Sequence, residues 1–188
     1  MIFNKIYRKF FEKTDWILSK IRILHLSFKY PNLKITGKSY IGKNCHIVCE
    51  DGGYMLLQDT HINFGSLLRC SKNANLSIKS SYIGMHNVIV ATEKIHISHS
   101  EIAEMVVIRD QNHKFDFSDT PISQKGYSSN PILIESNVWI GAKATILKGV
   151  IIGENSVVAA HSVVNKNVAK KSLVGGIPAK IIKYNNEV

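Results

Sequence analysis

The sequence is poor in cysteine, proline and acidic side chains, and it has no long uncharged apolar run. Its 188 residues include 3 cysteines and 4 prolines. Cys45, Cys49 and Cys70 are odd in number and do not form the CxxC pairs of zinc sites. We therefore expect them to be buried as small hydrophobic side chains. A membrane-spanning helix needs about 20 consecutive apolar residues, and we expect no such segment.

The opening residues, 1–20, are too densely charged for the apolar core of a secretory signal peptide. No small-residue cleavage site follows them. We therefore expect a cytoplasmic protein, and the unpaired cysteines agree with a reducing compartment.

Acidic residues number 14 against 24 lysines and arginines, so the formal net charge is +10. Such a surplus favours an anionic partner: acidic lipid, acidic glycan, a phosphate-rich cofactor or nucleic acid. No platform of basic and aromatic residues supports nucleic-acid binding, which we do not expect. With 45% hydrophobic and 20% charged residues, the chain can bury the core of one domain, which excludes wholesale disorder.

Residues 1–31 are predicted to form an N-terminal amphipathic helical arm that ends at Pro31. Its apolar stripe follows helical spacing: Ile2, Ile6, Phe10 and Ile17. About half of the net positive charge lies in this arm, which permits peripheral contact with the acidic inner face of the membrane. We favour packing of the arm against the main body or a neighbouring subunit, because further apolar residues need cover: Trp16, Leu18, Ile21 and Leu24.

After the arm, aliphatic residues recur at every sixth position. The strictest series lies in the C-terminal third: Ile134, Ile140, Ile146, Ile152, Val158 and Val164. A helix would scatter such residues around its axis, because it has 3.6 residues per turn. A short strand with a tight corner fits the step, and three such units form a triangular coil of about 18 residues. We therefore predict an all-β fold, a parallel β-helix over residues 32–183, followed by a tail at 184–188.

The six-residue step is disturbed in the middle of the chain. Ile83 and Ile89 recur as Ile102 and Ile108, 19 residues later. One extra residue per turn predicts a β-bulge in two adjacent coils. Residues 50–70 lack the pattern, so their register is not predicted.

The segment 134–181 contains the series VWIG, ILKGV, SVVAAHSVV and GGIPAK in repeat register. This series resembles the hexapeptide-repeat acyltransferase family, and most of all its bacterial sugar and polysaccharide O-acetyltransferases. The resemblance implies a left-handed coil, acetyl-CoA as co-substrate and a homotrimer. A related carbonic anhydrase family binds zinc through histidines, but His96 and His99 do not have its spacing, so we expect no metal.

The repeat stops after Ile108 and resumes at Ile134. We predict that residues 109–131 protrude as a loop, and long irregular stretches inside compact repeats are usually functional. The resemblance implies that its only histidine, His113, is the catalytic general base, and imidazole titrates near neutrality as that role requires. Without the resemblance, the alternative interpretation is that His113 is an ordinary loop histidine exposed to solvent. Asp110 is our first choice to orient His113, although ordinary turn chemistry explains it equally well.

Trp139 falls at an outward position of its coil, where an exposed indole favours a partner. In similar O-acetyltransferases the tryptophan of the VWIG motif lines the acceptor or pantetheine tunnel, and the resemblance implies this catalytic-site role for Trp139. A contact between subunits is the alternative.

The resemblance also implies contacts with acetyl-CoA: Gly141, Ala142, Lys148, Ala160, Asn165, Lys166 and Lys180. Lysines supply positive charge for the phosphates, and small residues admit the pantetheine arm close to the backbone. The chain has no glycine-rich phosphate loop, so we do not expect ATP or NAD.

These expectations combine into one function. We expect an O-acetyltransferase that moves acetyl from acetyl-CoA to a hydroxyl of a bacterial surface polysaccharide, such as a capsule or O-antigen, or of its sugar precursor. In the expected homotrimer, His113 of one subunit meets Trp139 of another. The alternatives are N-acetylation of an amino-sugar nucleotide and a non-catalytic β-helix scaffold.

Overall fold

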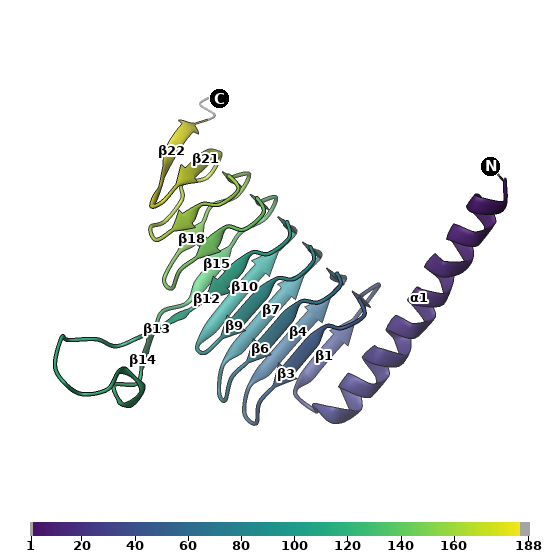
Figure 1. The fold of residues 1–188 in the computed structure, drawn as a ribbon, viewed down its shortest axis with the longest axis horizontal. Coiled ribbons are helices and arrows are strands. Elements are labelled where there is room, and N and C mark those ends of the chain that lie inside the picture. Colours follow the sequence, from purple (N-terminus) through teal and green to yellow (C-terminus); the bar gives the residue numbers. More distant parts are fainter. Residues whose placement is uncertain (1, 185–188) are drawn as a thin grey trace.

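The computed structural model describes the backbone of residues 2–184 and the side chains of residues 14–184. Residues 185–188 of the predicted tail lie outside the described residues, as do the side chains of the first half of the predicted arm. One long helix is followed by a stack of flat coils from which a single loop projects (Figure 1). The predicted parallel β-helix with an N-terminal helix is confirmed.

Three sheets form the walls of the β-helix, and their strands are parallel except at the C-terminal end. Sheet A contains β1 (Leu33–Thr36), β4 (Tyr54–Gln58), β7 (Asn75–Lys79), β10 (Lys94–Ser98), β15 (Ile132–Ile134) and β18 (Ile151–Ile152). Sheet B contains β2 (Tyr40–Ile41), β5 (His61–Ile62), β8 (Tyr82–Ile83), β11 (Glu101–Ile102), β16 (Trp139–Ile140), β19 (Val157–Val158), β21 (Ser172–Gly176) and the antiparallel β22 (Ala179–Tyr184). Sheet C contains β3 (His46–Cys49), β6 (Leu67–Cys70), β9 (Val88–Ala91), β12 (Val107–Arg109), β17 (Thr145–Ile146) and β20 (Val163–Val164).

The recurring aliphatic residues point into the coil and stack on one another. On sheet B they pair in register from coil to coil, and each is at most 1% exposed: Ile41, Ile62, Ile83, Ile102, Ile140 and Val158. Removing one such side chain from water stabilises the fold by about 1.5–3 kcal/mol. The inward ladder is therefore the core, as the six-residue step predicts.

Coils differ in length without losing register. Asn75 pairs with Lys94, a step of 19 residues, along five consecutive unbroken pairs. The predicted bulge is therefore wrong: the extra residue lengthens the sheet A strand, where Ile95 and Ile97 both point inward.

Residues 50–70 form ordinary coils although their sequence pattern is weak. Met55, Leu57 and Leu68 take the inward positions there and are fully buried. Leu33 pairs with Met55, a step of 22 residues, so these coils accommodate more chain than the C-terminal ones. The pattern fails in the sequence because the spacing changes, while the inward ladder continues.

Two corner features hold the coils at strand spacing. Gly84 and Gly141 face the backbone of the next coil so closely that a Cβ there would lie 2.7 Å from Ala103 C and 2.6 Å from Ala160 N. Buried hydroxyls provide the other feature: Ser100 Oγ accepts a hydrogen bond from Val138 N–H and donates to Glu135 C=O. Similar hydroxyls line the same corner: Ser39, Thr60, Ser81, Ser156 and Ser172.

The helix α1 (Ile2–Lys29) lies across the N-terminal end of the stack and ends just before Pro31 (Figure 1). Ser19 is buried, and its Oγ accepts a hydrogen bond of 2.8 Å from Ile41 N–H. Arg22 Nε donates to Ile41 C=O at 3.0 Å. The side chains of α1 therefore satisfy edge groups of β2 that no further strand covers.

The carboxylate of Asp15 adds a second tie between α1 and the first coil. It accepts hydrogen bonds from Tyr40 Oη and from Arg22 Nη2. The hydrogen bond from Tyr40 and the charge of Arg22 together lower the pKa of Asp15. Burial and the same hydrogen bond raise the pKa of Tyr40 to about 12.

All three cysteines are free thiols. Cys49 and Cys70 are buried as expected, whereas Cys45 is only partly buried. Burial raises the pKa of the Cys70 thiol to about 12. Among the described residues, no helix combines the length and the apolar character needed to cross a bilayer.

Replacement of Ser100 by alanine tests the corner hydroxyls. Ser100→Ala leaves the buried Val138 N–H without its acceptor, so we expect the free energy of unfolding to fall by about 1–3 kcal/mol. Urea unfolding followed by circular dichroism measures the loss. Ser123→Ala, an exposed serine in the loop, is the control and should change the value by less than about 0.5 kcal/mol. Equal effects of the two variants would contradict the role of the corner hydroxyl.

Candidate active site

The chain leaves the β-helix after β12 and returns at β15, and the loop between them opens with a two-stranded hairpin (Figure 1). Its strands β13 (Gln111–His113) and β14 (Tyr127–Ser129) are antiparallel, and a short 3₁₀ turn, η1 (Ile122–Gln124), precedes β14. We call residues 111–129 the flap. Sequence reasoning did not predict this hairpin, because QNH and YSS lack a strand pattern.

The base of the flap is anchored by Asp110. Its side chain is fully buried and accepts three backbone hydrogen bonds, from Thr92, Glu93 and Lys94, at 2.7–2.8 Å. Its own C=O accepts Asn130 N–H at 2.9 Å, which closes the loop. These bonds show that Asp110 supports the start of the flap, and its expected role in orienting His113 stays a prediction.

His113 ends β13 and stands opposite Tyr127 in the hairpin register. The two rings lie 4.3 Å apart between centroids at a tilt of 44°. The imidazole is exposed, so it is held out from the body by a supported hairpin. Tyr127 is a site residue that sequence reasoning missed, since only the hairpin register places it beside His113.

The tip of the flap combines an internal ion pair with exposed aromatic rings. Lys125 Nζ and Ser118 donate hydrogen bonds to Asp116, and these bonds lower the pKa of that carboxyl group. Phe115 and Phe117 are exposed and touch each other edge-on, with centroids 5.7 Å apart. An ordered apolar tip of this kind is suited to contact another surface.

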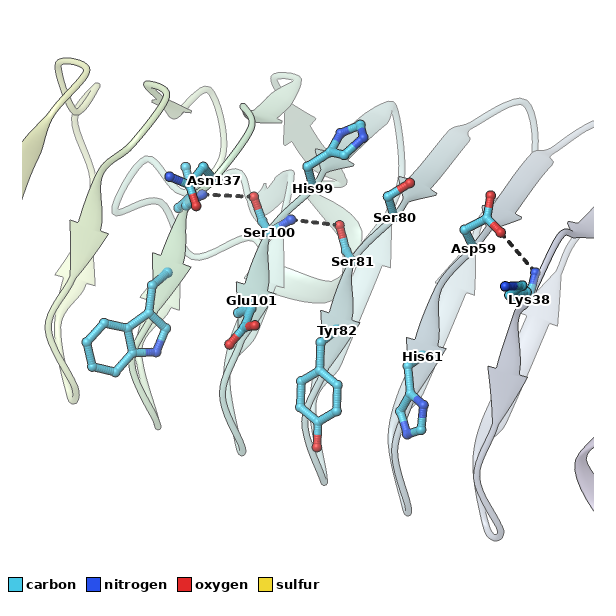
Figure 2. Close-up of a pocket in the computed structure, with 12 residues that line it drawn as sticks. Lys38, Asp59, His61, Ser80, Ser81, Tyr82, His99, Ser100, Glu101 and Asn137 are labelled. Atoms are coloured by element: carbon cyan, nitrogen blue, oxygen red, sulfur yellow. Dashed lines mark hydrogen bonds between the residues drawn. The ribbon is translucent and has the colours of Figure 1, made fainter. Parts of the chain in front are cut away.

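Trp139 lies on a different wall and lines a groove along sheet B. Figure 2 shows other side chains of this groove, among them Glu101, Tyr82 and His61. The side chain of Trp139 is 54% exposed, which confirms the outward position. The neighbouring coils place Glu101, Tyr82 and His61 in line with it. Burial lowers the pKa of His61, whose ring stacks on Tyr82 at 5.2 Å. We call this groove, about 530 Å³ in volume, the sheet B groove.

A second groove runs along sheet C toward the base of the flap. Tyr127 and Arg109 belong to its lining, together with Arg69 and His46. Arg69 Nε lies 3.2 Å from a carboxylate oxygen of Glu50. The groove is therefore basic near His113, and sequence reasoning missed it because only the coil register brings these positions together.

The expected acetyl-CoA contacts separate into three places. Gly141, Ala142 and Ala160 share the corner between sheets B and C, where His161 N–H donates to Ala142 C=O at 2.9 Å. Three polar residues follow the strands of sheet C: Lys148, Asn165 and Lys166. Lys148 Nζ donates to Ser128 Oγ at 2.8 Å, which ties it to the flap. Lys180 lies on β22, opposite Gly175.

The small residues at 141, 142 and 160 and the lysines at 148 and 166 together fit an extended ligand with an apolar arm and phosphates. Across the described side chains, 14–184, no three histidine, cysteine or acidic residues gather as a metal site would require.

Comparison with known sequences identifies relatives of the whole coil. Residues 131–166 match the family described as "Bacterial transferase hexapeptide (six repeats)". A protein of Escherichia coli K12 named "Putative lipopolysaccharide biosynthesis O-acetyl transferase WbbJ" is 31% identical over 166 residues, covering 77% of this chain and 82% of that protein. A Mycobacterium tuberculosis protein named "Probable acetyltransferase Rv3034c" is 28% identical over 174 residues, and the match spans 90% of this chain but 58% of that protein.

Comparison with solved structures points to the same fold. The N-acyltransferase AntD of Bacillus cereus, bound to dTDP and 3-hydroxybutyryl-CoA, has a TM-score of 0.71 at 21% identity, covering 85% of this chain and 87% of AntD. The hexapeptide-repeat acetyltransferase VCA0836 of Vibrio cholerae, bound to acetyl-CoA, has a TM-score of 0.58 at 27% identity, covering 88% and 79%.

Replacement of Asp110 by asparagine tests the anchor of the flap. Asp110→Asn replaces a charged acceptor of three N–H groups by an amide that turns its own N–H₂ toward them. We expect the free energy of unfolding to fall by about 2–3 kcal/mol, and the amides of β13 and β14 to exchange faster in hydrogen-exchange measurements. Asp119→Asn, on the exposed part of the flap, is the matched control. Unchanged exchange in the Asp110 variant would show that the anchor is elsewhere.

Proposed function

This chain belongs to the hexapeptide-repeat acyltransferase family, and from that premise we propose that it is an acetyl-CoA-dependent O-acetyltransferase. Its acceptor is a hydroxyl of a bacterial surface polysaccharide or of the sugar precursor. The name of the Escherichia coli relative supports the O-acetyl chemistry, and the acetyl-CoA bound to the Vibrio cholerae neighbour supports the donor. The observation that carries the proposal is an exposed imidazole, His113, on a hairpin anchored by a buried carboxylate.

In this proposal His113 is the general base. The acceptor hydroxyl gives its proton to the imidazole while its oxygen forms a bond to the thioester carbonyl carbon. The carbon–sulfur bond then breaks, and the imidazolium returns the proton to the sulfur that leaves. Backbone N–H groups of the coil wall stabilise the negative charge on the carbonyl oxygen between these events. No covalent enzyme intermediate is required.

The coil residues bind the donor. The small side chains of Ala142 and Ala160 let an extended chain approach the backbone, and Gly141 allows the coils to stack closely at this corner, since a Cβ there would lie 2.6 Å from Ala160 N. Lys148 and Lys166 lie beyond that corner and provide charge for phosphate groups. Because Lys148 is bonded to Ser128 of the flap, donor binding and flap position are coupled.

In this proposal the site is shared between two copies of the chain. His113 stands on the flap, which leaves the β-helix after sheet C, whereas Trp139 belongs to the sheet B groove. In a closed trimer the flap of one subunit reaches the sheet B groove of the next, and the aromatic tip at Phe115 and Phe117 becomes buried. The acceptor then lies between His113 and Trp139.

Replacement of His113 tests the base. We expect His113→Ala to lower kcat for acetyl transfer to a polysaccharide acceptor by about 10²–10⁴-fold, while the Kd for acetyl-CoA measured by calorimetry stays unchanged. His86→Ala, an exposed coil histidine, is the control. Wild-type turnover by the His113 variant would refute the base role, and failure of the wild-type protein to bind acetyl-CoA would favour a scaffold. Preference for an amino-sugar nucleotide would favour N-acetylation.

Mixed trimers test the shared site. His113→Ala and Trp139→Ala are each expected to be nearly inactive. When the two variants are co-expressed and assembled at equal amounts, one interface in each mixed trimer regains both residues, so about a quarter of wild-type activity should return. Mixing two separately folded, non-exchanging trimers is the control. No recovery on co-assembly would mean that the two residues do not meet across an interface.

A further inference from the structure

The helix α1 has two apolar faces, and the β-helix covers only one of them. Ser19, Ile23 and Leu26 face the coils. The opposite face has apolar residues at steps of four, three and four residues. They are Ile17, Ile21, Leu24 and Phe28, which are 54%, 59%, 73% and 92% exposed, respectively. We call these four residues the outer stripe. We expected the main body or a neighbouring subunit to cover Trp16, Leu18, Ile21 and Leu24. Cover by the main body is wrong, since all four are exposed, and cover by a neighbouring subunit stays a prediction.

The helix α1 lies at one end of the molecule (Figure 1), and the four side chains of the outer stripe are exposed. In the sequence, Phe3, Tyr7 and Phe10 follow the same three- and four-residue spacing further toward the N-terminus, with Thr14 at the intervening position. An exposed apolar stripe such as the four residues of the outer stripe is unusual on a surface that meets only water.

The charges of α1 are mainly positive. The only acidic residues of the helix are Glu12 and Asp15. Asp15 bonds to Tyr40 and Arg22 on the side of the coils. Lys20 Nζ donates to Ser39 C=O of the first coil at 3.5 Å. In the sequence, seven basic residues of the helix stand against these two acids, and the outer stripe itself contains no charged residue.

We propose that α1 lies in the plane of a lipid bilayer surface that carries anionic headgroups, with the outer stripe inserted at the boundary of headgroups and acyl chains. Apolar residues gain by leaving water, and the excess positive charge of the helix is attracted to anionic headgroups. Trp16, with Lys20 Nζ 4.2 Å from its ring centroid, is of the type enriched at such boundaries.

A second copy of the helix fits the outer stripe less well. The three- and four-residue steps also suit a coiled coil, in which flanking residues pair across the interface. Two copies would bring together two helices that each have seven basic and two acidic residues, and one of these acids, Asp15, is already bonded to Tyr40 and Arg22. Most of the basic residues would then remain without acidic partners, whereas an anionic bilayer supplies them.

Co-sedimentation of the full chain with vesicles tests the proposal. We expect binding to phosphatidylcholine vesicles that contain phosphatidylglycerol and little binding to phosphatidylcholine alone. The affinity should fall as salt is raised from about 0.1 M to about 1 M, because the screening length falls from about 10 Å to about 3 Å. Equal binding to both vesicle types, or no binding to either, overturns the proposal.

Substitutions in the outer stripe locate the binding surface. The double variant Leu24→Ser with Phe28→Ser should weaken vesicle binding by about tenfold or more. Lys13→Gln should weaken it by about fivefold. Ile182→Ser is the control: this residue is 62% exposed on β22, at the other end of the β-helix, and its variant should bind as wild type.

Two further measurements show whether a variant loses vesicle binding because its binding surface is altered, because it unfolds, or because it no longer assembles. Thermal unfolding by circular dichroism should be unchanged in the outer-stripe variants, because the altered side chains are exposed. Light scattering after gel filtration should give the same mass for the variants and the wild type. A lower mass together with unchanged vesicle binding would assign the outer stripe to self-association and overturn the proposal.

Discussion

The structure depends on parallel stacking of coils, in which each backbone strand finds its hydrogen-bond partners in the coils on either side. This stacking is possible only where every strand turns an aliphatic side chain inward onto the one before it. It also aligns outward residues, so that positions about 18 residues apart in sequence become neighbours on a wall. The line formed by His61, Tyr82, Glu101 and Trp139 exists for that reason. A site on the surface of such a molecule is therefore formed by residues that the strand register between coils brings side by side.

A stack of coils has two ends where backbone groups lack a neighbouring coil, and this one also has an interruption at the flap. Specific contacts satisfy the backbone at each of these three places. At the first coil, α1 supplies Ser19 and Arg22 to the backbone groups of Ile41. At the last coil, β22 folds back antiparallel on β21. At the interruption, Asp110 binds the N–H groups of the coil below and allows the chain to leave without losing register. The proposed catalytic and membrane-facing parts of the protein are both located at these departures from the repeat.

Much of the fold followed from periodicity, and the errors have physical causes. The coils, the inward ladder and the end of the arm before Pro31 were predictable, because spacing and proline geometry act locally. The bulge was wrong because an extra residue can equally lengthen a strand, as between Ile95 and Ile97. Residues 50–70 gave no pattern because their coils are longer. The role of Asp110 was missed because its partners, Thr92 to Lys94, belong to the preceding coil.

The order of the coils, the position of the interruption and the identity of its single histidine are properties of the sequence, since they depend on spacing along the chain. The sequence and its resemblance also indicated the chemistry. Only the tertiary structure decided that His113 stacks on Tyr127, that Lys148 reaches the flap, and that His113 and Trp139 lie on different parts of one chain. It alone decided which face of α1 stays uncovered. These are contacts between distant residues, and they exist only after the coils have stacked.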